Sequence, residues 1–279
     1  MVEVIPLKYG VAFKRIFSDP IVFSQFASDV LDLPISVDEV HTEYEYPEPV
    51  GYVKLKYDLF AEDKNTRTII EVQHVREDDF FDRFLYYHLI ALAEQVRNYY
   101  SYRFEQTVYT IVVLTRQPKP EHLRFSHAIS NMNPVDEFGT KHELYPHRLI
   151  FLNPKSVNEQ TPSRARPWLE LIADSLDSQI EEARYESDLF QQIIERMRRN
   201  TLSPDELARI KDESAWEEAK QNAKVEGIQT GLEQGRKQGE RRKAFEIART
   251  MLTKGIDISL VADVTGLDVA DIQQFIEQM

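Results

Sequence analysis

Two acidic side chains and an amide lie in neighbouring strand-like segments of this sequence. Asp58 belongs to one apolar run, and Glu71 and Gln73 belong to the next. Because side chains alternate between the two faces of a strand, Glu71 and Gln73 are expected to share a face. An antiparallel hairpin with a short turn at 64–65 places Asp58 opposite Glu71. The same register places Lys56 opposite Gln73.

Two carboxylates on opposed strands predict a cation site. Directly opposed side chains have Cβ atoms about 5 Å apart, and like charges at that spacing destabilise a sheet. A hard divalent cation removes the conflict; Mg²⁺ suits these oxygen ligands, with Mn²⁺ or Ca²⁺ as other candidates. Lys56, opposite Gln73 on the same face, would bring a positively charged side chain to this site. The ordinary alternatives are an exposed hairpin whose acids face water and an edge lysine that is merely solvated.

The surrounding pattern predicts the elements that hold this hairpin. We expect helices at 11–18 and 21–33, strands at 37–46, 52–61 and 67–75, a long helix at 79–103, and strands at 108–115 and 143–152. This order predicts an α/β core with a mixed sheet flanked by helices. After Pro162 the chain is expected to be entirely helical, with Ser203 as the N-cap of a helix that begins at Pro204.

Several segments together resemble a known family. The acids of the hairpin, in the form Asp58 and then Glu71-Val72-Gln73, resemble the signature of the PD-(D/E)XK phosphodiesterases, with Gln in place of the usual Lys. The opening at 8–17 and a glycine-rich helical tail make the chain similar to the Rpn family of recombination-promoting nucleases and transposase-like proteins. The resemblance implies a restriction-endonuclease-like core and a Mg²⁺-dependent DNA endonuclease. It also implies that Asp58, Glu71 and the Val72 carbonyl bind the metal.

The long predicted helix carries the candidates for contact with DNA. Arg83 and Tyr87 are four residues apart, so they share a helix face from which they can reach a phosphate. Gln95 and Tyr99 resemble a motif that follows the active-site strand in related nucleases. The ordinary alternatives are a core tyrosine, an arginine paired with a neighbouring aspartate, and a polar pair that arises by chance.

The C-terminal third has its own pattern. We divide the chain into a nuclease-like core at 1–160, a helical extension at 161–200, a charged connector at 201–242 and a small helix-turn-helix-like module at 243–279. Small residues recur every four positions in the connector, which fits either a hinge-like linker or a close homodimer contact between C-terminal helices. The last helix contains three acids and no Lys or Arg, so a role in protein contact is favoured over DNA reading.

Composition limits the class of protein. The net charge of −13 argues against nonspecific binding to nucleic acid, although a divalent cation can offset an acidic cleft. Cysteine is absent, no apolar run is long enough for a membrane span, and the N-terminus does not resemble a signal peptide, so we expect a cytoplasmic protein. Two alternatives to an endonuclease stay open: a catalytically silent relative that binds nucleic acid or protein, and a helical oligomerisation protein with a scaffold core.

Overall fold

The computed structural model divides the chain into two compact units, Met1–Ser214 and Ala215–Met279. It describes residues 1–277 apart from 48–52, 75–78, 97–99, 117–123 and 199–200. Within the described residues, no helix combines the length and the apolar character that crossing a bilayer requires.

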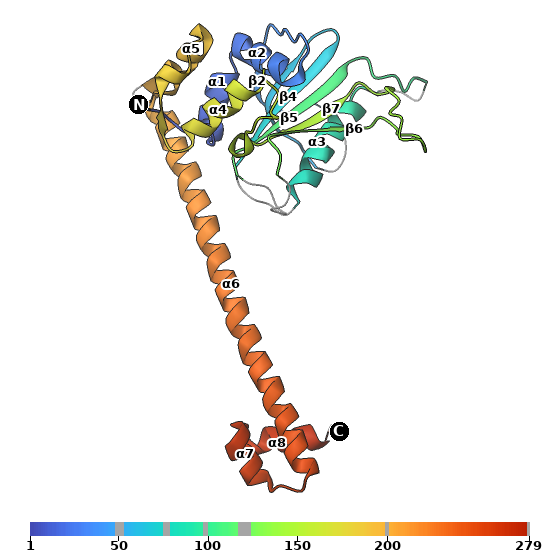
Figure 1. The fold of residues 1–279 in the computed structure, drawn as a ribbon, viewed down its shortest axis with the longest axis vertical. Helices are drawn as coiled ribbons and strands as arrows, with labels where there is room; N and C mark the ends of the chain where they lie inside the picture. The colour runs from blue at the N-terminus through green and yellow to red at the C-terminus, as the bar shows by residue number, and fades with distance from the viewer. Residues whose placement is uncertain (48–52, 75–78, 97–99, 117–123, 199–200, 278–279) are drawn as a thin grey trace. The chain divides into compact units, whose positions relative to one another are not determined.

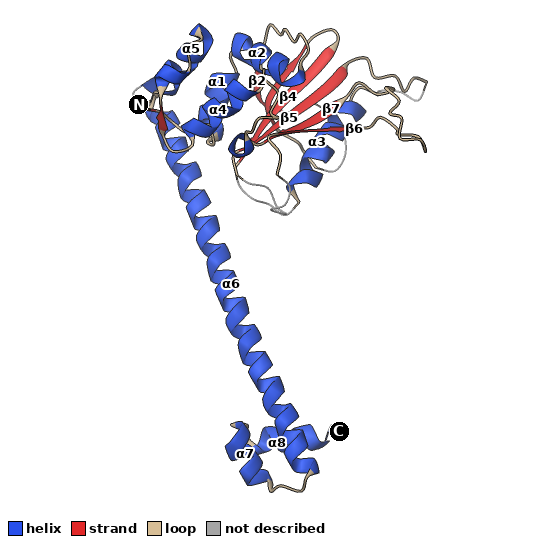
Figure 2. Cartoon of the chain, in the orientation of Figure 1, coloured by secondary structure: helices blue, strands red, loops and turns tan. Residues whose placement is uncertain are grey.

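A six-stranded sheet forms the centre of the first unit (Figures 1 and 2). The strand order is β2-β3-β4-β5-β7-β6, in which β4, β5 and β7 are parallel and the other neighbours are antiparallel. The bounds are β2 His41–Tyr44, β3 Tyr57–Glu62, β4 Thr66–Gln73, β5 Thr107–Leu114, β6 His127–Asn131 and β7 Arg148–Leu152. The mixed sheet predicted from the order of elements is confirmed.

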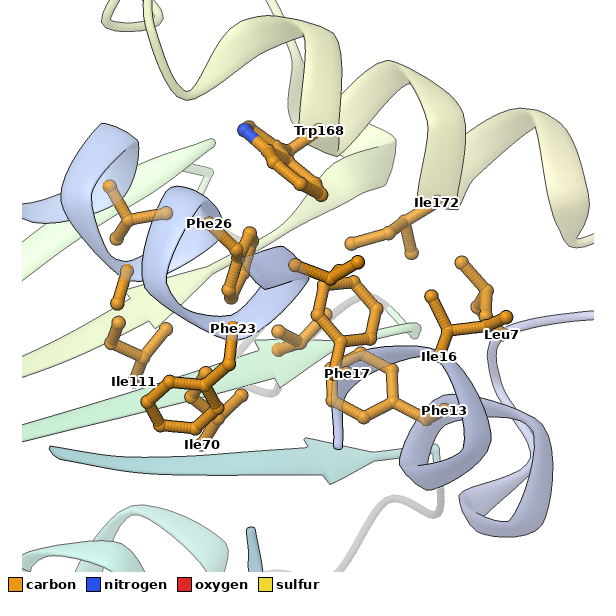
Figure 3. Packing of buried hydrophobic residues seen from close by; sticks show 14 of the residues in the cluster. Leu7, Phe13, Ile16, Phe17, Phe23, Phe26, Ile70, Ile111, Trp168 and Ile172 are labelled. Carbon is orange, nitrogen blue, oxygen red and sulfur yellow. The ribbon is translucent and has the colours of Figure 1, made fainter. Parts of the chain in front are cut away.

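Helices cover both faces of this sheet. On one face lie α1 (Gly10–Phe17), α2 (Pro20–Leu31) and α4 (Arg166–Ser175), and α5 (Asp188–Met197) packs against α1 within the same buried cluster. Figure 3 shows their contact layer, which includes Leu7, Phe13, Ile16, Phe17, Phe23, Phe26, Ile70, Ile111, Trp168 and Ile172. On the other face, α3 (Phe80–Ala93) packs against the alternate side chains of the same strands. The sheet is therefore apolar on both sides, as its parallel centre requires.

The segment 161–200 contributes to this core. Trp168, Ile172 and Ile193 are buried in the cluster that also contains α1, α2 and the sheet. One 3₁₀ turn, η1 (Pro154–Ser156), precedes α4. After α4 the chain forms a short strand, β8 (Gln179–Ile180), which pairs with β1 (Val2–Glu3), and a second 3₁₀ turn, η2 (Glu182–Arg184). The segment is thus not wholly helical, because β8 pairs with the N-terminus.

Two elements differ from the sequence-based expectation. The helix predicted to extend to 103 ends at Ala93, where Arg67 donates to the Ala91 carbonyl oxygen (3.1 Å) and pairs with Glu94 (2.9 Å). A buried cation at the helix C-terminus satisfies the carbonyl groups that another turn would use. The strand β6, which pairs with β7, lies between the strands expected at 108–115 and 143–152, where no strand was predicted, because its residues are mostly exposed and polar.

The second unit contains most of α6 (Pro204–Thr253), followed by α7 (Ile258–Thr265) and α8 (Val269–Glu277). Ser203 caps the α6 N-terminus as predicted, and the structure adds a capping box: the Glu206 N–H donates to Ser203 Oγ, and the Ser203 N–H donates to the Glu206 carboxylate. Gly266, at φ 69°, ends α7 in the left-handed conformation that glycine favours. In this unit Ala248, Val261 and Ile272 form a small buried cluster.

Candidate active site

The β3–β4 hairpin has the register that the sequence predicted. Leu59 pairs with Ile70, and continuing the ladder by one residue places Asp58 beside Glu71. The Asp58 N–H donates to Glu71 Oε1 (3.0 Å), and the Val72 N–H donates to Asp58 Oδ2 (3.1 Å). Each acid is therefore hydrogen-bonded to the backbone of the other strand, which fixes both side chains at the end of the hairpin that lies away from its turn.

Burial and mutual repulsion make this acid pair electrostatically unusual. Glu71 is only 3% exposed. Burial, followed by the nearby Asp58 charge, raises the pKa of its carboxyl group well above the ordinary value. Burial also raises the pKa of Asp58, although the Lys14 charge opposes the shift. Two carboxylates in such a place favour a bound cation or a bound proton over two free negative charges.

Lys14 of α1 lies beside the acids, a position that the sequence reasoning did not assign. Its Nζ is 3.7 Å from Asp58 Oδ1 and donates to the Glu43 carboxylate. Burial alone would lower the pKa of Lys14, but the surrounding acids Glu43, Asp58 and Glu213 raise it above the ordinary value. The only sequence signal was the position of Lys14 in the opening segment 8–17 that carries the family resemblance.

Glu43 of β2 completes the group on the other side of Asp58. The β2–β3 register, with Thr42 opposite Leu59, places Glu43 next to Asp58. Although burial raises its pKa, the hydrogen bond from Lys14 lowers the net value below the ordinary one. The backbone of Glu43 has φ 55°, a left-handed conformation that is uncommon for a residue other than glycine. A strained residue is kept where the surrounding structure holds it.

Lys56 and Gln73 are not in contact across the hairpin as the sequence suggested. Lys56 Nζ lies 3.4 Å from Glu43 and 3.7 Å from Glu45, both on the side of β3 opposite to β4. Its side chain is about half exposed. Gln73 ends β4, and its backbone carbonyl accepts the Thr115 N–H (3.0 Å).

Arg83 and Tyr87 lie near the acids from the α3 side. Both guanidinium nitrogens Nε and Nη2 of Arg83 donate to the Tyr87 hydroxyl (3.2 and 3.1 Å). Burial raises the pKa of Asp58 and Glu71, and the Arg83 charge opposes this shift in both. Arg83 therefore adds a second positive charge to the site.

Gln95 lies at the opposite end of the sheet. Its side-chain oxygen accepts the Gln106 N–H (2.8 Å), and the Gln106 side chain donates to the Asp63 carbonyl in the β3–β4 turn (2.6 Å). The strand β4 begins at this turn with Thr66, and Glu71 follows Thr66 by five residues, a distance of roughly 16 Å at the rise of a strand. The structure thus does not bring Gln95 to the acids, and Tyr99 lies outside the described residues.

Glu213 of α6 holds the start of α1. Its two carboxylate oxygens accept the Gly10 N–H (3.0 and 3.2 Å), at a helix whose N-cap Tyr9 makes no side-chain cap. Burial raises the pKa of Glu213. Because the two partners are 203 residues apart, sequence reasoning had no signal for this contact.

The acid pair has the chemistry of a divalent-cation site. Asp58 and Glu71 supply hard carboxylate oxygens, and Mg²⁺ is usually held by one or two carboxylates, with water and substrate filling the other positions. Burial raises the pKa of both carboxyl groups, and a cation bound between them would favour their ionised forms. Among the described residues, no group of three or more His, Cys, Asp or Glu side chains is arranged to hold a metal ion.

A helix-flanked mixed sheet with an acid pair on its hairpin defines a PD-(D/E)XK type of nuclease fold. Residues 9–226 match the family described as PD-(D/E)XK nuclease family transposase, and the chain belongs to this family. Residues 241–275 match the C-terminal HTH domain of the Rpn/YhgA-like nuclease family. Comparisons with curated proteins and with solved structures found no match.

These matches confirm the family resemblance and the fold expected from the sequence. They indicate a nuclease or transposase-like function, a class that typically uses divalent metals, and the HTH domain indicates DNA binding. In the structure α8 has acidic Asp271, which forms an ion pair with Arg241 (2.7 Å). The preference for protein contact by α8 stays a prediction.

Proposed function

We propose that this protein is a metal-dependent endonuclease that hydrolyses phosphodiester bonds in DNA, with Mg²⁺ as its cation. One observation carries the proposal: Asp58 and Glu71 are fixed side by side through hydrogen bonds to the backbone of each other's strand, and Glu71 is buried. Two carboxylates held this closely repel each other, and a bound divalent cation would remove that repulsion.

The proposed roles follow from the positions of the residues. Asp58, Glu71 and the Val72 carbonyl would hold the cation, which supplies Lewis-acid charge stabilisation when bound. Gln73, at the end of β4, would orient the water. In the hydrolysis, the water oxygen forms a bond to phosphorus and one phosphorus–oxygen ester bond breaks. The proton that the water loses balances the proton that the leaving oxygen gains.

Contacts outside the acid pair would position DNA. We propose that Arg83, held against the Tyr87 hydroxyl, contacts a phosphate next to the scissile bond. The net charge of −13 favours contact at restricted basic places over broad nonspecific binding. The HTH domain would supply a second DNA contact.

We also propose a homodimer through the C-terminal helices. Val225, Ile228 and Leu232 of α6 follow coiled-coil spacing and are 43%, 54% and 70% exposed. A second copy of the same helix would bury this stripe. A monomeric mass in light scattering at micromolar concentration would contradict the dimer.

The test is nicking of supercoiled plasmid by the full chain with Mg²⁺. We expect cleavage that EDTA abolishes and that Asp58→Asn or Glu71→Gln slows by about 10³-fold or more, the scale of losing a preorganised electrostatic contact. Removing one of two repelling buried carboxylates relieves their conflict, so Glu71→Gln should unfold at the wild-type temperature or above it.

Two results would contradict the proposed endonuclease activity of this site. Wild-type protein that binds DNA but does not cleave it with Mg²⁺, Mn²⁺ or Ca²⁺ would support a silent DNA-binding relative, for which Gln73 in place of Lys is the specific sign. Cleavage that persists in Asp58→Asn would place the activity elsewhere.

A further inference from the structure

The active-site acids have a positively charged neighbour that does not come from the hairpin. In this chain position 73 is Gln, so the strand that carries Glu71 supplies no positive charge two residues later. Lys14 belongs to α1, and its Nζ lies 3.7 Å from Asp58 Oδ1. Its side chain is 21% exposed, so Lys14 is partly open to solvent beside the acids.

We infer that Lys14 is a charge-stabilising residue of this active site and that Glu43 is the residue that positions it. The inference rests on the proposed hydrolysis of phosphodiesters. Lys14 stabilises negative charge on a non-bridging oxygen of the scissile phosphate, and no proton transfer from its ammonium group is needed. Lys56 points toward β2 and does not have this role.

Glu43 has the geometry of a positioning residue. It accepts a hydrogen bond from Lys14 and lies 3.4 Å from Lys56, so one carboxylate fixes the Lys14 ammonium beside Asp58. The backbone of Glu43 is left-handed, with φ 55°, although this residue lies within β2. This conformation costs energy compared with the extended backbone of an ordinary strand residue. That conformation turns the Glu43 side chain toward Lys14, and the strain is explained if the contact is needed.

The helix that carries Lys14 is itself anchored. Glu213 caps the α1 N-terminus at Gly10, and Arg15, the next residue after Lys14, forms an ion pair with Glu206 (2.7 Å). Lys14, Arg15, Ser18 and Thr42 line one groove of about 770 Å³ together with Glu43. Because Lys14 and Glu43 both line this groove, a phosphate group that enters it would meet the Lys14 side chain.

The experiment compares Lys14→Gln, Lys14→Arg and Glu43→Gln in single-turnover cleavage at saturating DNA. We expect Lys14→Gln to slow cleavage by about 100-fold, the effect of losing one preorganised charge contact. Lys14→Arg should recover about tenfold of that loss. Glu43→Gln should slow wild-type cleavage by about tenfold but should have no further effect in the Lys14→Gln background, because Glu43 acts through Lys14.

Three controls separate chemistry from folding and binding. Lys64→Gln changes an exposed lysine in the β3–β4 turn and should leave the rate unchanged. DNA affinity measured in EDTA should change less than about threefold in Lys14→Gln, because one phosphate contact of many is lost. Thermal unfolding should show that each variant is folded.

The inference is overturned if folded Lys14→Gln cleaves at the wild-type rate, or if Lys56→Gln causes the larger loss. Additive effects of Glu43→Gln and Lys14→Gln would remove the positioning role of Glu43. A wild-type chain that cleaves while Lys14→Gln has no defect rejects the role of Lys14 alone. A wild-type chain that fails to cleave rejects the proposed function instead.

Discussion

The two compact units bury very different amounts of apolar surface. Met1–Ser214 contains two extensive buried clusters, one on each face of the sheet. In the described part of Ala215–Met279 the fully buried cluster consists of Ala248, Val261 and Ile272. A buried acid pair is costly to fold around, so it occurs where a large core can offset the cost. A small core suits a module that makes contacts and performs no chemistry.

The largest effect on stability is expected from Trp168 of the first unit. Trp168 is 1% exposed, packs edge-on against Phe26 and donates from Nε1 to Asp29 (2.9 Å). Trp168→Ala should cost about 3–5 kcal/mol of unfolding free energy, through lost transfer energy and an unfilled cavity. Urea unfolding followed by circular dichroism measures the loss.

The matched control is Trp168→Phe, which keeps an aromatic ring and should cost less. Hydrogen exchange in 241–275 should be unchanged by either substitution, because those residues form their own cluster. Loss of protection there would contradict the separation of the two units.

The second effect is a loss of stability in acid that is confined to the first unit. His88 is 2% exposed beside Thr110, and burial, followed by the charge of His147, lowers its pKa from 6.5 to about 4. The unfolded chain then binds the proton more readily, so stability is complete above pH 6.5 and is lost as the pH falls toward 4. The loss reaches on the order of 3 kcal/mol at 1.36 kcal/mol for each pKa unit.

The comparison of wild type with His88→Gln isolates this contribution. Urea unfolding at pH 7 and pH 4.5 should show a smaller pH-dependent loss in His88→Gln, since the amide does not titrate. The second unit contains no histidine, so its unfolding should not follow this dependence. Equal pH dependence in the two proteins would show that His88 is not the responsible group.

The smallest effect concerns two glycines of the second unit. Gly227 lies within α6 and Gly255 lies beyond it at φ 76°, and an added Cβ meets nothing within 4 Å at either position. Gly227→Ala should stabilise the unit by about 1 kcal/mol through helix propensity. Gly255→Ala should destabilise it by roughly 1–2 kcal/mol, because a side chain is strained in that left-handed conformation.

Thermal unfolding of the two glycine variants gives shifts of opposite sign under this prediction. A lower stability of Gly227→Ala would show that another surface, such as the second copy proposed above, packs against this glycine.

Local patterns were sufficient for most of the fold. Apolar runs predicted the two strands that carry Asp58 and Glu71, and a short turn at 64–65 gave their register, because the position of the turn fixes which residues are opposed. Capping residues such as Ser203 predicted the start of α6. The early end of α3 was not predictable, because Arg67, far from it in sequence, satisfies its last carbonyl groups.

The site divides in the same way. The hairpin itself brings Asp58 and Glu71 together, so their spacing in the sequence was enough to propose them. The predicted register placed Lys56 opposite Gln73 across the hairpin. The Lys56 side chain instead lies beside Glu43, because carboxylates of opposite charge lie on the β2 side of the hairpin. Pairing strengths between strands are not visible in one sequence.

The sequence by itself determined the acid pair and the class of fold, because both depend on residues that are close along the chain. Only the tertiary structure decided which positively charged side chain lies beside the acids. Lys14 reaches Asp58 from α1, and α6 holds that helix through Glu213. The physical reason is that backbone periodicity is a local property of the chain. A charge contact between distant segments depends on packing that no local pattern encodes.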